Sequence, residues 1–290
     1  MYKRQDLVEH CRGKYGPDHQ QTLLSVSNLA RDLYGLGRYA ESLDLQRSTW
    51  DAYRTRNGDR HPLVLAAWRT IALGLRKTGR IREARDESRG LYLTCRTHLG
   101  ADNRLTLAAM MTYANALAAA GDVYQAAQLA ADAVDDHRRA YTERNPFTLV
   151  AGTNHAIILR ALGERRRARS VGEASFRALG YTLGTDHPYT IAAAVGVCND
   201  LVLAQEQDTA RRLLAGTLED ARRVLGEYHP DALTCAINLG LLLGEKPSAG
   251  TSLLGQGIDA LRGVLGAEHP TVTAAIGGRM GECDVEPPPV

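Results

Sequence analysis

The sequence predicts an all-α fold, a right-handed α-solenoid of antiparallel helix pairs. Three observations predict it: a landmark that recurs at a fixed spacing, a leucine at a fixed distance after each landmark, and a composition that favours helix. Ala, Leu and Arg dominate the 290 residues, whereas there are two Phe and two Trp. Because the core of a repeat array grows along its axis, this length fits a single stack of repeats.

The landmark is a short element of the form Gly-x-Asp-His-Pro. Its starts are separated by 42, 42, 42, 42, 42 and 40 residues, and they fall at Gly16, Gly58, Gly100, Thr142, Gly184, Gly226 and Gly266. Seventeen residues after each of the first six starts stands a leucine: Leu33, Leu75, Leu117, Leu159, Leu201 and Leu243. Self-similarity at such a period is the signature of stacked repeats, each of which completes its core against its neighbours.

Each repeat predicts two helices joined by a short turn. A small residue three positions before the leucine shares its helical face and lets a second helix approach: Ala30, Ala72, Ala114, Ala156, Cys198 and Gly240. Four positions after the leucine, a glycine ends the first helix in four repeats, and Gln205 and Pro247 take its place in the last two. The proline that follows the landmark histidine suits the first turn of the next helix.

These elements predict four parts of the chain. Residues 16–265 form six tandem repeats of 40–42 residues, residues 266–282 a C-terminal capping helix, and residues 283–290 a Pro-rich tail that cannot continue a helix. Residues 1–15 are interpreted as a truncated end that retains the second helix of a lost repeat. Residues 1–5 resemble the translation of a sequencing-library transposon end, so we expect them to be an artefact. The unpaired helix would expose Leu7 and Cys11, through which the chain could self-associate.

Several segments carry a family resemblance. Residues 28–30, Leu33, the turn at residues 37–41 and the linker at residues 184–190 resemble the tetratricopeptide repeats of kinesin light chains, whose units have 42 residues. The resemblance spans about residue 6 to residue 281, and it implies a protein-protein interaction scaffold. The Ala/Arg/Gly-rich composition and residues 283–289 are similar to the C-terminal repeat region of FxSxx-COOH system tetratricopeptide repeat proteins. That similarity implies an alternative, a sensor or oligomerisation arm of a larger bacterial NTPase-type signalling or peptide-modification-system protein.

The sequence predicts no enzyme, and no catalytic, cofactor or metal site. Five histidines recur at one repeat offset, which places them one per repeat, whereas metal ligands must converge on a point. They are His19, His61, His187, His229 and His269. Hydrolase and metalloprotease motifs such as Gly-x-Ser-x-Gly and His-Glu-x-x-His are absent from the sequence. The five cysteines show no CxxC pairing and are interpreted as buried thiols of a reducing compartment.

The charge pattern predicts no nucleic-acid or membrane partner. The formal net charge is +2 with 23% charged residues, so no global field draws the chain to an anionic surface. The arginine run at residues 165–167 has no interleaved aromatic platform and is interpreted as a solvated face. Because no stretch of 18 apolar residues and no signal peptide occur in the sequence, we expect a cytoplasmic protein.

The candidate binding site is the concave surface, which the first helix of each repeat lines in this architecture. Positions two before, one after and four after the small residue should face this groove. We select the polar residues near these offsets: Asn28, Arg31, Tyr34, Arg69, Arg76, Asn115, Asn154, Arg160, Asn199 and Asn238. An asparagine amide offers a donor and an acceptor to a peptide backbone, and the kinesin-light-chain resemblance implies that matching asparagines hold cargo this way. We therefore predict an extended protein or peptide partner that is acidic or presents a C-terminal carboxylate, held most tightly by repeats one to four.

Overall fold

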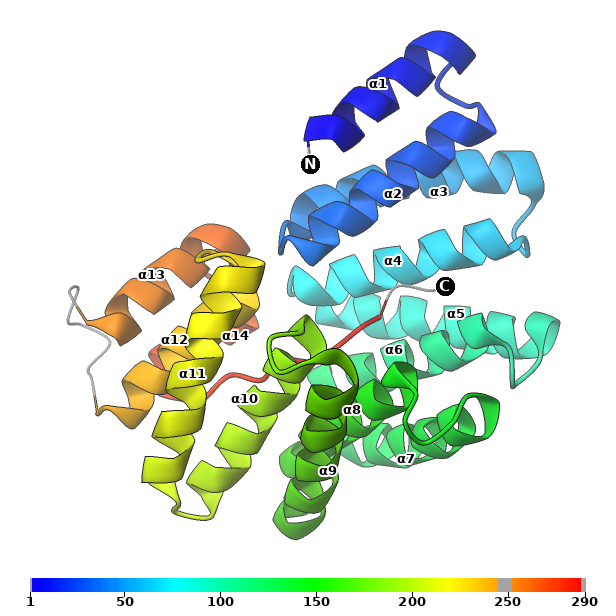
Figure 1. Cartoon of the computed structure of the whole chain (residues 1–290). Helices are drawn as coiled ribbons and strands as arrows, with labels where there is room; N and C mark the ends of the chain where they lie inside the picture. Colours follow the sequence, from blue (N-terminus) through cyan, green and yellow to red (C-terminus); the bar gives the residue numbers. More distant parts are fainter. Residues whose placement is uncertain (1, 245–251, 288–290) are drawn as a thin grey trace. The chain divides into compact units, whose positions relative to one another are not determined.

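The computed structural model of the chain describes residues 2–244 and 252–287, and its regular structure in these ranges is entirely helical (Figure 1). The all-helical prediction is confirmed. The helices in chain order are α1 (Tyr2–Tyr15), α2 (Gln20–Gly35), α3 (Tyr39–Asn57), α4 (Pro62–Lys77), α5 (Ile81–Leu99), α6 (Arg104–Ala119), α7 (Val123–Ala140), α8 (Pro146–Leu162), α9 (Arg165–Leu183), α10 (Pro188–Leu203), α11 (Gln207–Leu225), α12 (Pro230–Leu242), α13 (Leu253–Leu265) and α14 (Pro270–Ile276).

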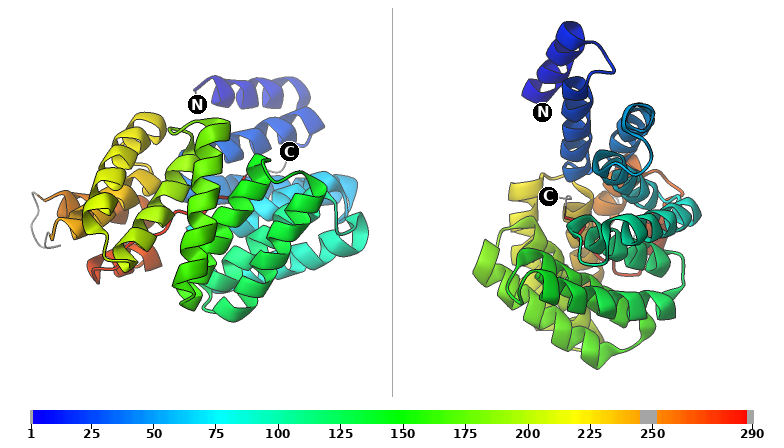
Figure 2. Two further views of the ribbon diagram at one scale, coloured as in Figure 1. Left: turned by 60° about the horizontal axis from the view of Figure 1, so that its bottom comes forward. Right: turned by 90° about the vertical axis from the view of Figure 1, so that its right-hand side faces the viewer.

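The chain forms two compact units. Unit 1 holds α1 to α6, and unit 2 holds α7 to α14 with the segment that follows them, residues 121–287. The boundary falls at Gly121, inside the third repeat, so α6 and α7 belong to different units. Within each unit, successive helices pack pairwise, and the first helices of neighbouring repeats also touch, α2 with α4, α4 with α6, and α8 with α10 (Figure 2).

The landmark histidines begin helices. At His19, His61, His187, His229 and His269 the backbone is extended, and the side chain accepts a hydrogen bond from the backbone N–H two residues later. The distances from that nitrogen to His Nδ1 are 3.1–3.2 Å. Asn103 and Asn145 take the same position in the other two repeats, through Oδ1 at 2.9 Å. These seven side chains therefore satisfy a backbone donor that would otherwise lack a partner at the start of a helix.

The turn between the two helices of a repeat needs a left-handed residue. Gly37, Gly79, Gly121 and Gly163 have φ between 74° and 90° there, and Gln205 adopts a φ of 64° at the equivalent place. Pro247, the residue at this offset in the sixth repeat, lies outside the described residues. A left-handed backbone is favourable for glycine, which lacks a Cβ, and costly for other residues.

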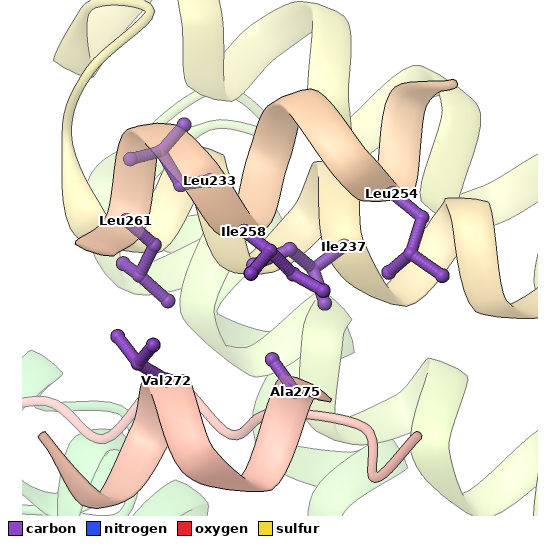
Figure 3. Packing of buried hydrophobic residues seen from close by; sticks show 7 residues of the cluster. All are labelled: Leu233, Ile237, Leu254, Ile258, Leu261, Val272 and Ala275. Atoms are coloured by element: carbon purple, nitrogen blue, oxygen red, sulfur yellow. The ribbon is translucent and has the colours of Figure 1, made fainter. Parts of the chain in front are cut away.

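Apolar side chains from three helices form the core at the end of unit 2 (Figure 3). Leu233 and Ile237 of α12 form one cluster with Leu261 of α13 and Val272 of α14. A Cβ on Gly257 of α13 would lie 2.9 Å from Ile237 Cγ1, so the absence of a side chain there lets α12 and α13 approach closely.

The two ends of the repeat array differ from the sequence-based expectation. Helix α1 packs on α2 through Val8, and the Cys11 thiol is buried beside the Ser25 hydroxyl, so the predicted exposed apolar face includes Leu7 but not Cys11. The predicted capping helix is also shorter than residues 266–282, because α14 ends at Ile276 where two glycines follow.

The remaining cysteines are buried as well, and no described helix is long and apolar enough to span a bilayer.

Candidate functional site

The chain folds back along its own repeats after α14. The residues that follow the glycines at 277 and 278, here called the return segment (residues 279–287), have no regular secondary structure. Hydrogen bonds join this segment to α12, α10 and α8 of unit 2, so it passes the first helices of three repeats in reverse order (Figures 1 and 2). The surface that receives it contains four of the residues that the sequence predicted for the groove.

One end of the return segment is held at Gly281. Asn238 of α12 donates from Nδ2 to the Gly281 carbonyl oxygen at 3.0 Å and accepts the Gly281 N–H on Oδ1 at 2.7 Å. Asn199 of α10 donates to the same carbonyl at 2.9 Å. The two amides therefore satisfy both backbone polar groups of one residue without using its side chain.

The other end is held at Val285 by the same device. Asn154 of α8 donates to the Val285 carbonyl oxygen at 2.7 Å and accepts its N–H at 2.9 Å. The Asn154 side chain is buried, and so are Cys283 and Val285 of the segment. Side chains two apart share one face of an extended chain, so burial of Cys283 and Val285 is what an extended segment lying on this surface produces.

A charged cluster lies between the two clamps. Arg160 of α8 donates to both carboxylate oxygens of Asp200 in α10, at 2.8 and 2.9 Å, and to Glu282 of the return segment at 2.7 Å. Burial would lower the pKa of Arg160, but its hydrogen bond to Asp200 and the charges of Glu282 and Asp200 outweigh that effect, so the pKa is raised. The Arg160 side chain is thus a buried cation, 7% exposed. It binds Asp200 and one further carboxylate, which in this structure is that of Glu282.

The repeat positions explain how these groups converge. Asn154 and Arg160 of α8 stand two before and four after the small residue Ala156, and both side chains reach the return segment. Asn199 stands one position after the small residue Cys198, and Asn238 stands two positions before the small residue Gly240. Both are among the positions predicted to face the groove. A stack of equivalent helices therefore brings these amides onto one surface, although they are up to 84 residues apart in sequence, from residue 154 to residue 238.

Sequence reasoning missed two members of the cluster, Asp200 and Glu282. A signal for the first was available, because Asp200 is the only charged residue of α10 and Arg160 the only Asp, Glu, Lys or Arg of α8. Single opposite charges on two otherwise apolar helices, one repeat apart, indicate a buried pair. Glu282 had no such signal, because residues 266–282 were predicted to be helical.

Close packing constrains the residue at the first clamp. A Cβ on Gly281 would lie 2.6 Å from Thr234 Cγ2, and the Thr234 hydroxyl is already fixed by its hydrogen bond to the Pro230 carbonyl oxygen. Thr234 is β-branched and has little rotamer freedom in a helix. The clamp formed by Asn199 and Asn238 therefore fits glycine and excludes larger residues.

In unit 1, the predicted residues Asn28 and Arg31 line a cleft. Its volume is about 430 Å³, and Leu24, Tyr53 and Thr70 are among its other walls. Arg31 donates to the Asn28 side-chain oxygen, so the two polar groups lie together on α2. Tyr34, the third predicted residue of this helix, packs its ring against Tyr39 with the centroids 5.1 Å apart.

The other predicted residues of unit 1 are buried. Arg69, Arg76 and Asn115 are at most 8% exposed, and the Arg69 Nε donates to Thr112 Oγ1 at 2.9 Å. This contact joins α4 to α6, so Arg69 contributes to the packing of two first helices.

Many arginines of the second helices pair with carboxylates. Arg138, Arg167 and Arg211 each bind an acidic residue three positions earlier, and Arg169 binds Glu173 and Glu206. These pairs neutralise much of the positive charge that the arginine runs suggest. Within the described ranges, no group of three or more His, Cys, Asp or Glu side chains is arranged to hold a metal ion.

Comparisons with known proteins agree with this architecture. A tetratricopeptide repeat family model matches residues 22–63. The chain is similar to a kinesin light chain with nearly identical TPR-like repeats from Podosopora anserina, with 21% identity over 71% of this chain and 97% of that chain, and a TM-score of 0.54. It is also similar to BtubC (BKLC) from P. vanneervenii, at 16% identity over 85% and 94% of the two chains with a TM-score of 0.54. No curated protein matches the chain.

A further solved structure with the same fold is the apo form of the quorum sensor NprR from B. thuringiensis. The identity is 14%, 97% of this chain and 81% of that chain are covered, and the TM-score is 0.59. The chain therefore contains a tetratricopeptide repeat at residues 22–63, set within a fold of stacked helix pairs. Its repeats recur every 42 residues, or 40 in the last step, and it shares the helical repeat fold of these solved structures.

Proposed function

We propose that this protein is a non-catalytic scaffold whose unit 2 groove binds an extended, acidic peptide or a partner segment of that chemistry. The observation that supports it is the double hydrogen bond that Asn154 makes to both backbone groups of Val285. An amide that reads backbone accepts many sequences, whereas Arg160 adds a preference for a carboxylate. The groove thus offers the chemistry of peptide recognition, and we assign it no reaction.

The cost of burying these amides supports a binding role. Beneath the return segment, Asn154, Asn199 and Asn238 are 0–5% exposed, and asparagine is a weak helix former. A buried amide without partners costs about 1–3 kcal/mol, so each of these groups needs a polar partner on the groove surface. A peptide backbone can supply that partner along its whole length.

A displayed library of random peptides tests the proposal on the full chain. We expect enrichment of acidic peptides, and we expect their affinity to fall about 10-fold or more in the variant Asn154→Ala with Asn199→Ala, because two of the three amides that bind the peptide backbone are lost. This variant keeps the Arg160–Asp200 pair, so the packing of α8 on α10 is retained. The matched control is Asn57→Ala at the end of α3, where the amide donates only to the Tyr53 carbonyl within its own helix.

Two results would contradict the proposal. The first is that peptides enriched on the wild-type chain bind the double asparagine variant equally well. The second is that neither the wild-type chain nor Gly281→Ala, in which the return segment is disfavoured, enriches peptides at all.

The alternative from the sequence, an arm of a larger NTPase-type protein of the FxSxx-COOH system, would use the same groove. It predicts a Walker-type phosphate loop encoded upstream of residue 1. Sequencing that region in the source genome tests it, and further repeats or a native start in its place would argue against it.

A further inference from the structure

We infer that the return segment is a ligand held in cis, and that the partner of the groove is an extended segment with the same sequence pattern. The pattern is a glycine, a glutamate directly after it, and an apolar residue three positions after the glutamate, as at Gly281, Glu282 and Val285. This inference rests on the proposed function and specifies its ligand. A partner segment of this pattern would bind by displacing residues 281–285 from the groove.

The pattern follows from the contacts. The position clamped by Asn238 and Asn199 excludes a Cβ, because Thr234 Cγ2 would lie only 2.6 Å away. The next residue places its carboxylate on Arg160 at 2.7 Å. The clamp on Asn154 is four residues beyond the glycine, a span of about 13 Å for an extended chain. Its residue in the return segment is Val285, whose side chain is 5% exposed.

The contacts are also of a kind that a separate chain can reproduce. Four of the hydrogen bonds at the two clamps go to backbone atoms of Gly281 and Val285 through Asn238 and Asn154, and any peptide carries those atoms. The Arg160–Asp200 pair does not depend on the return segment, since it joins α8 to α10 directly. The groove surface therefore keeps its cation and its paired helices when the segment leaves.

Attachment to α14 makes the cis segment a strong competitor. Only Gly277 and Gly278 separate the return segment from the helix end at Ile276, and such a short linker gives an effective concentration on the order of millimolar. A free peptide with the same contacts must compete against that concentration. Weakening the cis segment should therefore strengthen binding in trans, which a purely structural segment would not do.

Release of the segment can be followed at Cys283, which is 1% exposed. In the full chain, Gly281→Ala should raise the rate at which a maleimide labels Cys283 by about 10-fold or more, because overpacking against Thr234 disfavours the docked state. Glu282→Lys, which places a second cation at Arg160, should act in the same direction without altering the backbone. The charge-matched control is Glu268→Lys, at an exposed position before α14. Mass mapping of the labelled peptide separates Cys283 from the other cysteines.

Binding in trans is measured with a fluorescent peptide of residues 279–287 that carries Cys283→Ser. We expect it to bind Gly281→Ala and Glu282→Lys chains about 10-fold or more tightly than the wild-type chain, and to accelerate labelling of Cys283 in the wild-type chain. The same peptide with alanine at the glycine position, or lysine at the glutamate position, should bind at least about 10-fold more weakly.

The inference is overturned if Cys283 labelling rises in the variants while the affinity for the peptide stays at the wild-type value, since the segment would then be only structural. It is also overturned if the variants double in mass on size-exclusion chromatography with Cys283 still protected, because the occupant would then be the segment of a second copy. In both cases library peptides that depend on Asn154 would leave the proposed function standing. Loss of all peptide binding to every chain would instead reject the proposed function.

Discussion

Gln205 shows how one residue carries strain that its equivalents avoid. It adopts a φ of 64° at the turn where four other repeats place a glycine, and it is the only residue other than glycine with positive φ in the described ranges. We expect Gln205→Gly to raise the free energy of unfolding by about 1 kcal/mol, because glycine reaches this conformation without a Cβ clash. Chemical denaturation measures the change.

The control for this prediction is the preceding residue. Ala204 has a φ of −87°, so Ala204→Gly gains nothing from relief of strain and should leave stability unchanged or lower it. An equal gain in both variants would mean that the left-handed conformation of Gln205 carries no cost.

The buried pair of Arg160 and Asp200 predicts a different pattern of stability. Asp200 is 3% exposed, and Arg160→Met would leave its carboxylate without its cation, which we expect to cost about 3 kcal/mol or more. Adding Asp200→Asn should recover part of that loss, because the uncompensated charge disappears. Urea unfolding of the wild type, the single variant and the double variant tests this. A double variant less stable than Arg160→Met would show that the carboxylate was not the source of the loss.

At the scale of elements, the cap formed by His187 makes the start of α10 sensitive to acid. Burial lowers the pKa of His187, although Asp186 partly offsets the effect, so the folded chain favours neutral imidazole more than the unfolded chain does. Protonation removes the Nδ1 acceptor for the Tyr189 N–H and places a cation at a helix N-terminus. The stabilisation by this cap is therefore present above the unfolded pKa of about 6.5, and it is lost as pH falls toward and below the lowered folded pKa.

The chain supplies the matched variant for a test. Asn145 caps α8 in the same way without titrating, so His187→Asn should keep the cap and reduce the loss of melting temperature between pH 7.5 and 5.5. The effect of one cap is up to about 1 kcal/mol. His10→Asn, at an exposed histidine within α1 that caps no helix, is the control against which the loss of melting temperature is compared. An unchanged slope in His187→Asn would exclude this cap as a source of acid sensitivity.

The elements that could be predicted from the sequence are those whose signals are local. The histidine at 187, the proline after it and the glycine at 163 fix a helix start and a turn within a few residues, and most repeats carry the same residues at these positions. The end of α14 at Ile276 was missed, since glycines at 277 and 278 stop the helix before the predicted boundary. The course of residues 279–287 depends on Asn238, Asn199 and Asn154, which lie 43 to 131 residues away in sequence.

The candidate site was predictable to the same degree. Asn154 and Asn238 occupy the same repeat position and Asn199 lies three positions further along its helix, so stacking of the helices brings the three amides onto one surface. The offset contains no information on what binds to this surface, and the sequence did not predict that the return segment lies there. The division of the third repeat at Gly121 was missed for a similar reason, since its sequence follows the same pattern as its neighbours.

At the scale of the molecule, a repeat array is stabilised mainly by contacts between neighbours, so distant repeats respond separately to a local change. The return segment is an exception in unit 2, because it joins α12 to α8 through Gly281 and Val285. We expect Gly281→Ala to raise amide hydrogen exchange in α8 and α12 together, by several-fold, while α3 of unit 1 keeps its wild-type protection. Exchange followed by mass spectrometry resolves these helices. Faster exchange confined to α12 would show that the segment does not link the stability of the repeats, and an equal rise in α3 would point to a change in global stability instead.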